Sequence, residues 1–147
     1  MHESDPSQYS PAIVISETRI EHLLRTGKAA PRFLQGIFPF AGRGVFDAAL
    51  LDDSLLFRVP EGKTASVIYF RAGNLSDDLI YLTLSADETH VRYFPVGPRA
   101  DFHVPLAIVE PYAAGTRIAV CYAAPRGLTG TVVVDVGMIE TDGVDRS

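Results

Sequence analysis

Apolar and polar residues alternate along much of the chain from residue 55 to residue 139, in short runs separated by turn-forming residues. A period of two places successive side chains on opposite faces of a strand, so that one face can be buried and the other left toward solvent. The separators are rich in Gly, Pro, Asn and Asp, which are typical of turns. The pattern predicts strands at 55–59, 65–71, 79–84, 90–94, 102–109, 117–123 and 131–139.

The spacing of these strands indicates how they pair. No helical stretch between them is long enough to cross over between parallel strands, so antiparallel pairing is favoured. The pattern predicts an all-β fold, an antiparallel β-sandwich that is jelly-roll-like. Within 65–71 the alternation assigns Ile68 and Phe70 to the core and Val67 and Tyr69 to the outer face.

One short helix is expected before the strands. Thr18 and Glu21 match a capping box, and the apolar residues that follow fall on one helical face. Gly27 stands where a left-handed residue would end the helix. These signals predict a single N-terminal helix over residues 17–26.

The segment 31–40 combines high apolar content with two prolines and a glycine. We expect these residues to prevent continuous ladder pairing, which makes the segment an extended arm or a sheet edge. Its aromatic residues Phe33, Phe38 and Phe40 must be buried against the protein's own sheet or against a neighbouring subunit. We therefore expect these three residues at an oligomer interface.

The domain organisation follows from these assignments. Residues 1–44 are expected to form an N-terminal arm with the short helix and the extended aromatic segment. Residues 45–140 are expected to form the β-sandwich domain, and residues 141–147 a polar tail. With 147 residues, 47% of them apolar, the chain is long enough for one core without disulfide support.

Charge and cysteine content narrow the partners and the compartment. The chain carries 13 basic and 18 acidic residues, a formal charge of −5, and no run of Lys or Arg. We therefore do not expect nucleic acid as a partner. We do not expect a membrane either, since no apolar run approaches the roughly 20 residues of a membrane span. The single cysteine, Cys121, and a polar opening without the features of a secretory signal predict a reducing, cytoplasmic location.

The outer faces of the expected strands are rich in aromatic and Arg side chains. Tyr supplies a flat amphipathic ring and Arg a planar hydrogen-bonding fork, which suit a polar ligand or a protein surface. The alternative interpretation is that Tyr and Arg pair across strands and cover the sheet from outside. The candidate ligand-binding residues are Tyr69, Arg71, Tyr81, Arg92 and, in a loop, Arg126.

Motifs for catalysis and for cofactors are weak. His90 and His103 are the candidate metal ligands, but the chain has no HxH pair of the kind that marks the metal-binding cupin family. Cys121 falls in an apolar strand, where a buried thiol usually serves packing. No nucleotide-binding or serine-nucleophile motif is present, so no cofactor is expected.

Together these observations predict a non-catalytic β-sandwich interaction module that assembles into a homo-oligomer and binds a protein or a small-molecule ligand. The alternative is a small-molecule or carbohydrate-binding protein that uses a Tyr/Arg sheet face. A cupin-like metal-dependent enzyme built around the two histidines is a less favoured alternative.

Overall fold

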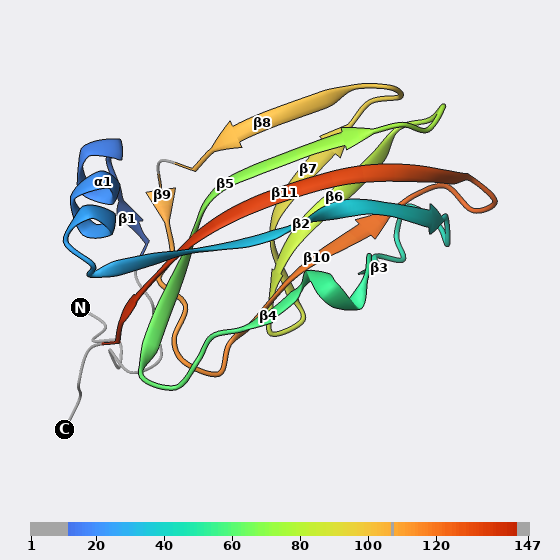
Figure 1. The fold of residues 1–147 in the computed structure, drawn as a ribbon. Coiled ribbons are helices and arrows are strands. Elements are labelled where there is room, and N and C mark those ends of the chain that lie inside the picture. The colour runs from blue at the N-terminus through green and yellow to red at the C-terminus, as the bar shows by residue number, and fades with distance from the viewer. Residues whose placement is uncertain (1–11, 107, 144–147) are drawn as a thin grey trace, which may run out of the picture.

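The computed structural model describes residues 12–106 and 108–143, which form two β-sheets packed face to face (Figure 1). Each sheet has one apolar side, and the two apolar sides are buried against each other. In chain order the elements are β1 (Ile13–Val14), α1 (Glu17–Arg25), β2 (Ala29–Ala41), β3 (Ala49–Leu50), the 3₁₀ helix η2 (Asp53–Leu55), β4 (Leu56–Arg58), β5 (Lys63–Asn74), β6 (Ile80–Ala86), β7 (Thr89–Val96), β8 (Asp101–Pro105), β9 (Ile108–Val109), β10 (Arg117–Ala123) and β11 (Thr129–Asp142).

The strand order is that of a jelly roll. The four-stranded sheet has the order β2-β11-β5-β8, and the five-stranded sheet has the order β3-β10-β6-β7, with β4 also paired to β10. All of these pairs are antiparallel. The chain changes between the two large sheets from β2 to β3, from β4 to β5, from β5 to β6, from β7 to β8, from β8 by way of β9 to β10, and from β10 to β11. This connectivity confirms the predicted antiparallel, jelly-roll-like sandwich.

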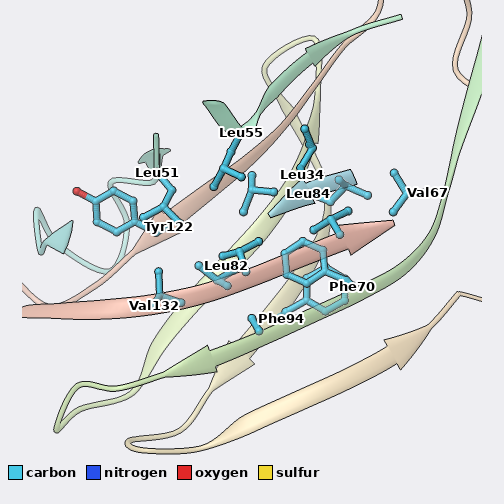
Figure 2. Packing of buried hydrophobic residues seen from close by; sticks show 14 of the residues in the cluster. Leu34, Leu51, Leu55, Val67, Phe70, Leu82, Leu84, Phe94, Tyr122 and Val132 are labelled. Carbon is cyan, nitrogen blue, oxygen red and sulfur yellow. The ribbon is translucent and has the colours of Figure 1, made fainter. Parts of the chain in front are cut away.

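The core lies between the sheets and follows the predicted alternation in β6, β10 and β11. Ile80, Leu82 and Leu84 point inward from β6, and each is at most 2% exposed. Phe70 of β5 and Phe94 of β7 stack between the two sheets with ring centroids 4.2 Å apart (Figure 2). This aromatic contact joins the four-stranded sheet to the five-stranded sheet.

A β-bulge in β5 reverses two of the predicted face assignments. The register with β11 shifts between Gly137, opposite Tyr69, and Met138, opposite Val67. Ile68 is therefore an extra residue, and an extra residue reverses the alternation on one side of the bulge. Val67 is buried in the core at 3% exposure, whereas Ile68 is only half-buried.

β2 is a continuous edge strand, contrary to the expectation that its prolines prevent ladder pairing. It pairs with β11 along its whole length. Pro31 and Pro39 are an even number of residues apart, so both can occupy positions whose backbone nitrogen faces away from β11, where no N–H is needed. The sandwich therefore includes part of the segment 1–44 that the sequence assigned to an arm, and β11 reaches Asp142 in the expected tail.

The strand predicted over residues 102–109 is divided in the structure. β8 ends at Pro105, and β9 pairs with β1 in a separate two-stranded sheet. Leu106 still donates its backbone N–H to the Ile68 carbonyl at 2.8 Å, so the chain leaves β5 only after that residue. The two short strands β1 and β9 lie beside α1 at one end of the sandwich (Figure 1).

The helix is present where the sequence predicted it, but its cap differs. The N-cap is Ser16, whose side chain accepts a hydrogen bond from the Arg19 backbone N–H at 3.1 Å. Gly27 has a positive φ of 73°, as expected for the residue that ends the helix. Among the described residues, no helix is long and apolar enough to cross a membrane.

Candidate functional site

The outer face of the five-stranded sheet is hollowed by a row of small residues. Ser85 of β6 and Ala119 and Cys121 of β10 form its floor, and each is at most 8% exposed. They lie on neighbouring strands, because Ser85 is the direct partner of Ala119 in the β6–β10 ladder. The concavity above them, called here the sheet cavity, has a volume of about 300 Å³.

One wall of the sheet cavity is apolar and comes from the interrupted edge of the sheet. Leu50 of β3 is opposite Cys121, and Leu56 of β4 is opposite Ala119, so both leucines project from the outer face. Between these strands the chain leaves the ladder at η2, whose N-cap carboxylate, Asp52, accepts from the Ser54 backbone N–H at 3.0 Å. The two leucines therefore flank the cavity from separate short strands.

The opposite wall is polar and comes from the β6–β7 hairpin. Glu88 and His90 line the cavity on this side. Both turn residues, Asp87 and Glu88, have positive φ values, 49° and 70°. Such a two-residue turn suits the twist of a hairpin but is unfavourable for residues other than Gly, Asn and Asp. Glu88 is thus held in a strained conformation beside the cavity.

Arg117 fixes the position of this hairpin at one end of the cavity. Its backbone N–H donates to the Asp87 carboxylate at 2.9 Å. Its guanidinium nitrogens lie 3.7 Å from Asp87 Oδ1 and 3.9 Å from Glu88 Oε1, too far for hydrogen bonds. Within the described part of the chain the guanidinium makes no hydrogen bond, so its donors are available to a ligand.

The floor is closed by a buried hydrogen-bonded group. Thr83 is fully buried, and its hydroxyl lies 2.9 Å from His90 Nδ1. Burial raises the pKa of the Cys121 thiol, and hydrogen bonds with the Thr83 and Ser85 hydroxyls oppose that shift more weakly. The thiol is therefore protonated at neutral pH and is a weak nucleophile.

Aromatic rings continue the outer face beyond His90. The rings of Tyr93 and His90 have centroids 6.0 Å apart, and those of Tyr93 and Tyr81 are 6.1 Å apart. The Tyr81 hydroxyl donates to the Val45 carbonyl, which ties the β2–β3 loop to this end of the sheet. Tyr93 is 61% exposed, so its ring is accessible from solvent.

The predicted ligand-binding residues do not share one surface. Tyr69 and Arg71 lie on the outer face of the four-stranded sheet, whereas Tyr81 lies on the outer face of the five-stranded sheet. Arg92 is opposite the inward-facing Leu84 and lies 3.7 Å from Glu110 at the margin of the core. Arg126 is exposed in the turn between β10 and β11.

The three aromatic residues expected at an oligomer interface are also divided. Phe40 is 7% exposed in the core, and Phe38 packs against the core from its margin. Both point inward from β2 and contact the protein's own sandwich. Only Phe33, at 53% exposure, presents its ring on the outer face.

The two candidate metal ligands lie in different sheets. His90 belongs to β7 of the five-stranded sheet, and His103 belongs to β8 of the four-stranded sheet. His103 contacts Tyr69 edge to face, with ring centroids 5.7 Å apart, on the opposite outer face from His90. Because the two histidines lie on opposite outer faces, they cannot bind the same metal ion. Within residues 12–106 and 108–143, no three His, Cys, Asp or Glu side chains are grouped as for a metal ion.

Sequence reasoning missed most of the sheet cavity, although one signal for it was present. The outer-face positions of β10 include Ala119 and Cys121, and those of β6 include Thr83 and Ser85, all of them small. A run of small residues on neighbouring outer faces indicates a hollow in a sheet. Leu50 had no such signal, because its segment is too short and irregular to show a period. Leu56 falls in the predicted strand over 55–59, but the pattern there gives no sign of a neighbouring hollow.

Comparisons with known proteins give no family for this chain. No family model matches it, and no curated protein matches it. One solved structure with a similar arrangement is the CBM36-1 domain of a multidomain xylanase from the hindgut metagenome of Trinervitermes trinervoides, with 11% identity, a TM-score of 0.44 and coverage of 78% of this chain and 100% of that chain. Another is from Bacillus endospore appendages, a family of disulfide-linked pili, with 9% identity, a TM-score of 0.39 and coverage of 80% and 93%. Both TM-scores are too low to bear on family or function.

Proposed function

We propose that this protein is a small-molecule-binding β-sandwich module whose ligand occupies the sheet cavity. The observation that carries this proposal is the contrast between the cavity's walls. Leu50 and Leu56 supply an apolar side, and Glu88, His90 and Arg117 supply a polar side across a floor of small buried residues. A concave, largely apolar site with a few convergent polar groups is the usual form of a ligand pocket.

The side chains of the cavity floor favour reversible binding of a ligand over covalent chemistry. Cys121 is the most reactive type of side chain there, and burial raises the pKa of its thiol rather than activating it. His90 is engaged by the Thr83 hydroxyl through Nδ1. The floor residues belong to paired central strands, so the cavity keeps its shape before a ligand arrives, which lowers the entropic cost of binding.

The test is a screen of small molecules by ¹H–¹⁵N NMR with a variant that fills the cavity. Ala119→Leu projects a larger side chain from the floor, and Ser85→Leu does so from the neighbouring strand. We expect ligands to shift the backbone amides of Ser85, Ala119 and Cys121 in the wild type and to lose affinity for both variants. Ala41→Leu, on the exposed end of β2, is the matched control and should bind as the wild type does.

The spectra and thermal unfolding of each variant establish that the sandwich is intact. Ligands that bind the Leu variants and the wild type with equal affinity would overturn the proposal. The same conclusion would follow if bound molecules shifted amides only outside the sheet cavity.

Self-association is a second candidate function, supported by the outer face of the four-stranded sheet. Phe33 and Ile37 of β2 and Val133 of β11 are 53%, 69% and 37% exposed and lie on the same face, since Ile37 is the direct partner of Val133. An exposed apolar row on a sheet is typical of a protein contact. Pro31 and Pro39 remove two donors from the free edge of β2, which disfavours pairing through that edge.

We propose a second copy of this chain as the occupant of that face, because its charges are self-complementary. Arg71 and Asp135 are direct partners in the β5–β11 ladder, and the Asp135 carboxylate accepts from the Tyr69 hydroxyl at 3.0 Å. In a two-fold interface, Arg71 of each subunit can pair with Asp135 of the partner subunit, so that symmetry forms the ion pair twice.

The mass in solution tests this second candidate. The wild type should be a dimer at micromolar concentration, and Ile37→Asp should be a folded monomer. Leu75→Asp, at a residue 57% exposed outside this face, is the matched control and should remain dimeric. A monomeric wild type, or a dimer unaffected by Ile37→Asp, would contradict it.

A further inference from the structure

Two arginines lie directly opposite each other on β4 and β10, and one of them, Arg117, lines the sheet cavity. Arg58 of β4 and Arg117 of β10 are direct partners in the antiparallel ladder. Both project from the outer face, because they continue the alternation of the outward pair Leu56 and Ala119. Like charges at directly opposite positions destabilise a strand pair unless an anion lies between or beside them.

The protein's own carboxylates neutralise this pair only in part. Asp87 and Glu88 lie near Arg117, but at 3.7 and 3.9 Å they form no hydrogen bond with its guanidinium. The Glu88 side chain is 85% exposed and extends into solvent. Arg58 is exposed and has no carboxylate partner among the described residues. The guanidinium of Arg117, which lines the cavity, thus makes no hydrogen bond among the described residues, and Arg58 stands opposite it in the ladder.

The apolar wall begins at the next outward-facing pair of the ladder, Leu56 and Ala119. Leu56 is two residues before Arg58 on the same face, and Leu50 continues the wall along β3. Arginine recognises carboxylates through two parallel hydrogen bonds, and the adjacent leucines suit a hydrocarbon body. The geometry therefore provides a charged end and an apolar end within one cavity of about 300 Å³.

We infer that the ligand of the sheet cavity is a small amphipathic carboxylate. Its carboxylate pairs with Arg117 and Arg58, and its apolar part lies against Leu50 and Leu56. This inference rests on the proposed function, since it names the ligand class of the same site. Glu88 has a defined role in it, because its carboxylate competes with the ligand for Arg117 and repels it.

Three probes of equal chain length separate the ligand classes: hexanoate, hexanol and hexylamine. Each is titrated into the ¹⁵N-labelled full chain, and the dissociation constant is taken from the amide shifts of Ser85, Ala119 and Cys121. We expect hexanoate to bind most tightly. Arg117→Gln should weaken hexanoate binding about tenfold and leave hexanol binding unchanged.

Removing a positive or a negative charge beside the cavity should change the hexanoate affinity in opposite directions. Arg58→Gln should weaken hexanoate binding by several fold, whereas Glu88→Gln should strengthen it. Arg126→Gln, in the exposed β10–β11 turn, is the matched control and should leave all three affinities unchanged. Added salt should weaken hexanoate binding and spare hexanol, because the interaction with exposed arginines is screened.

The outcomes distinguish the ligand class from the site itself. If hexanol binds as tightly as hexanoate at the same amides, the carboxylate inference fails and the proposed site stands. If hexylamine binds most tightly, the carboxylates of Asp87 and Glu88 rather than the arginines attract the ligand's charged end, and the inference is also overturned. If no probe shifts the cavity amides, the inference fails, and the broader screen with Ala119→Leu decides whether the proposed function fails with it.

Discussion

Tyr69 lies across Gly137, its direct partner in the β5–β11 ladder, and occupies the space that a side chain at residue 137 would need. A Cβ atom added to Gly137 would lie 1.9 Å from Tyr69 Cε2 and 2.5 Å from Cζ. The ring reaches past the glycine, and its hydroxyl donates to Asp135 at 3.0 Å. Any side chain larger than hydrogen at residue 137 would therefore displace the Tyr69 ring.

Gly137→Ala should destabilise the fold by about 1–3 kcal/mol, because the ring must leave its position and lose the hydrogen bond to Asp135. Urea unfolding measures the change. Gly97→Ala is the control, since a Cβ there meets only the Ala100 Cβ, at 3.7 Å. The double variant with Tyr69→Ala should cost less than the sum of the two single changes. Additive costs would contradict the contact.

The raised pKa of Tyr69 leads us to expect that the protein loses stability at alkaline pH. Burial, followed by the hydrogen bond to Asp135, raises the pKa of Tyr69 from 10.0 to about 12. A raised pKa means that the folded state holds the phenol proton more tightly than the unfolded chain does. Its contribution is therefore complete below about pH 10 and is lost as the pH rises through about 12.

Unfolding measured across that range checks the expectation, together with tyrosinate absorbance. Burial raises the pKa of Tyr112 to about 12 as well, so Tyr69→Phe and Tyr112→Phe should each reduce the alkaline loss. Titration of all six tyrosines near their ordinary pKa would contradict both assignments.

Phe70 is the central contact between the sheets. Its ring is fully buried, stacks on Phe94 at 4.2 Å and lies 5.9 Å from the ring of Phe102. Phe70→Ala should lower the free energy of unfolding by about 3–5 kcal/mol, through lost burial and the cavity left behind. Phe46→Ala is the matched control, since Phe46 is 99% exposed and should change stability by less than about 0.5 kcal/mol. Equal effects of the two changes would be incompatible with this core.

The thiol of Cys121 should react slowly in the folded protein. Burial raises its pKa, and its residue is only 8% exposed on the cavity floor. At about pH 8 we expect alkylation by iodoacetamide to be much slower in the folded protein than in the urea-unfolded chain. The unfolded chain is its own control, because Cys121 is the single cysteine. Equal rates would show an accessible, activated thiol.

The fold was predictable where the local pattern is regular. Alternation in β6, β10 and β11 assigned the core-facing residues correctly, since each of these strands has one face on the core. It did not show that small outward residues such as Ser85 and Ala119 are buried as well. The β-bulge at Ile68 was not predictable, because its cause is the non-local pairing of β5 with β11. Pro31 and Pro39 were interpreted as breaks, although at a sheet edge a missing N–H need not interrupt the ladder.

The site was less predictable, because it depends on strand order. Residues from β3, β4, β6, β7 and β10 meet at the sheet cavity, and local periodicity says nothing about which strands are neighbours. The pattern placed Tyr69 and Tyr81 both on outer faces but could not separate the two sheets. Glu88 carried no signal, since a charged residue in a turn is ordinary unless its backbone conformation is known.

Crystallographic soaking with a mixed set of small fragments shows where ligands bind without assuming their chemistry, and so decides whether the sheet cavity is the ligand site. We expect fragments to gather in the sheet cavity, between Leu56 and Arg117, and carboxylate-bearing fragments to place their oxygens at the Arg117 guanidinium. Fragments that leave this cavity empty and collect elsewhere, such as the shallow surface between Pro39 and Thr131, would contradict it.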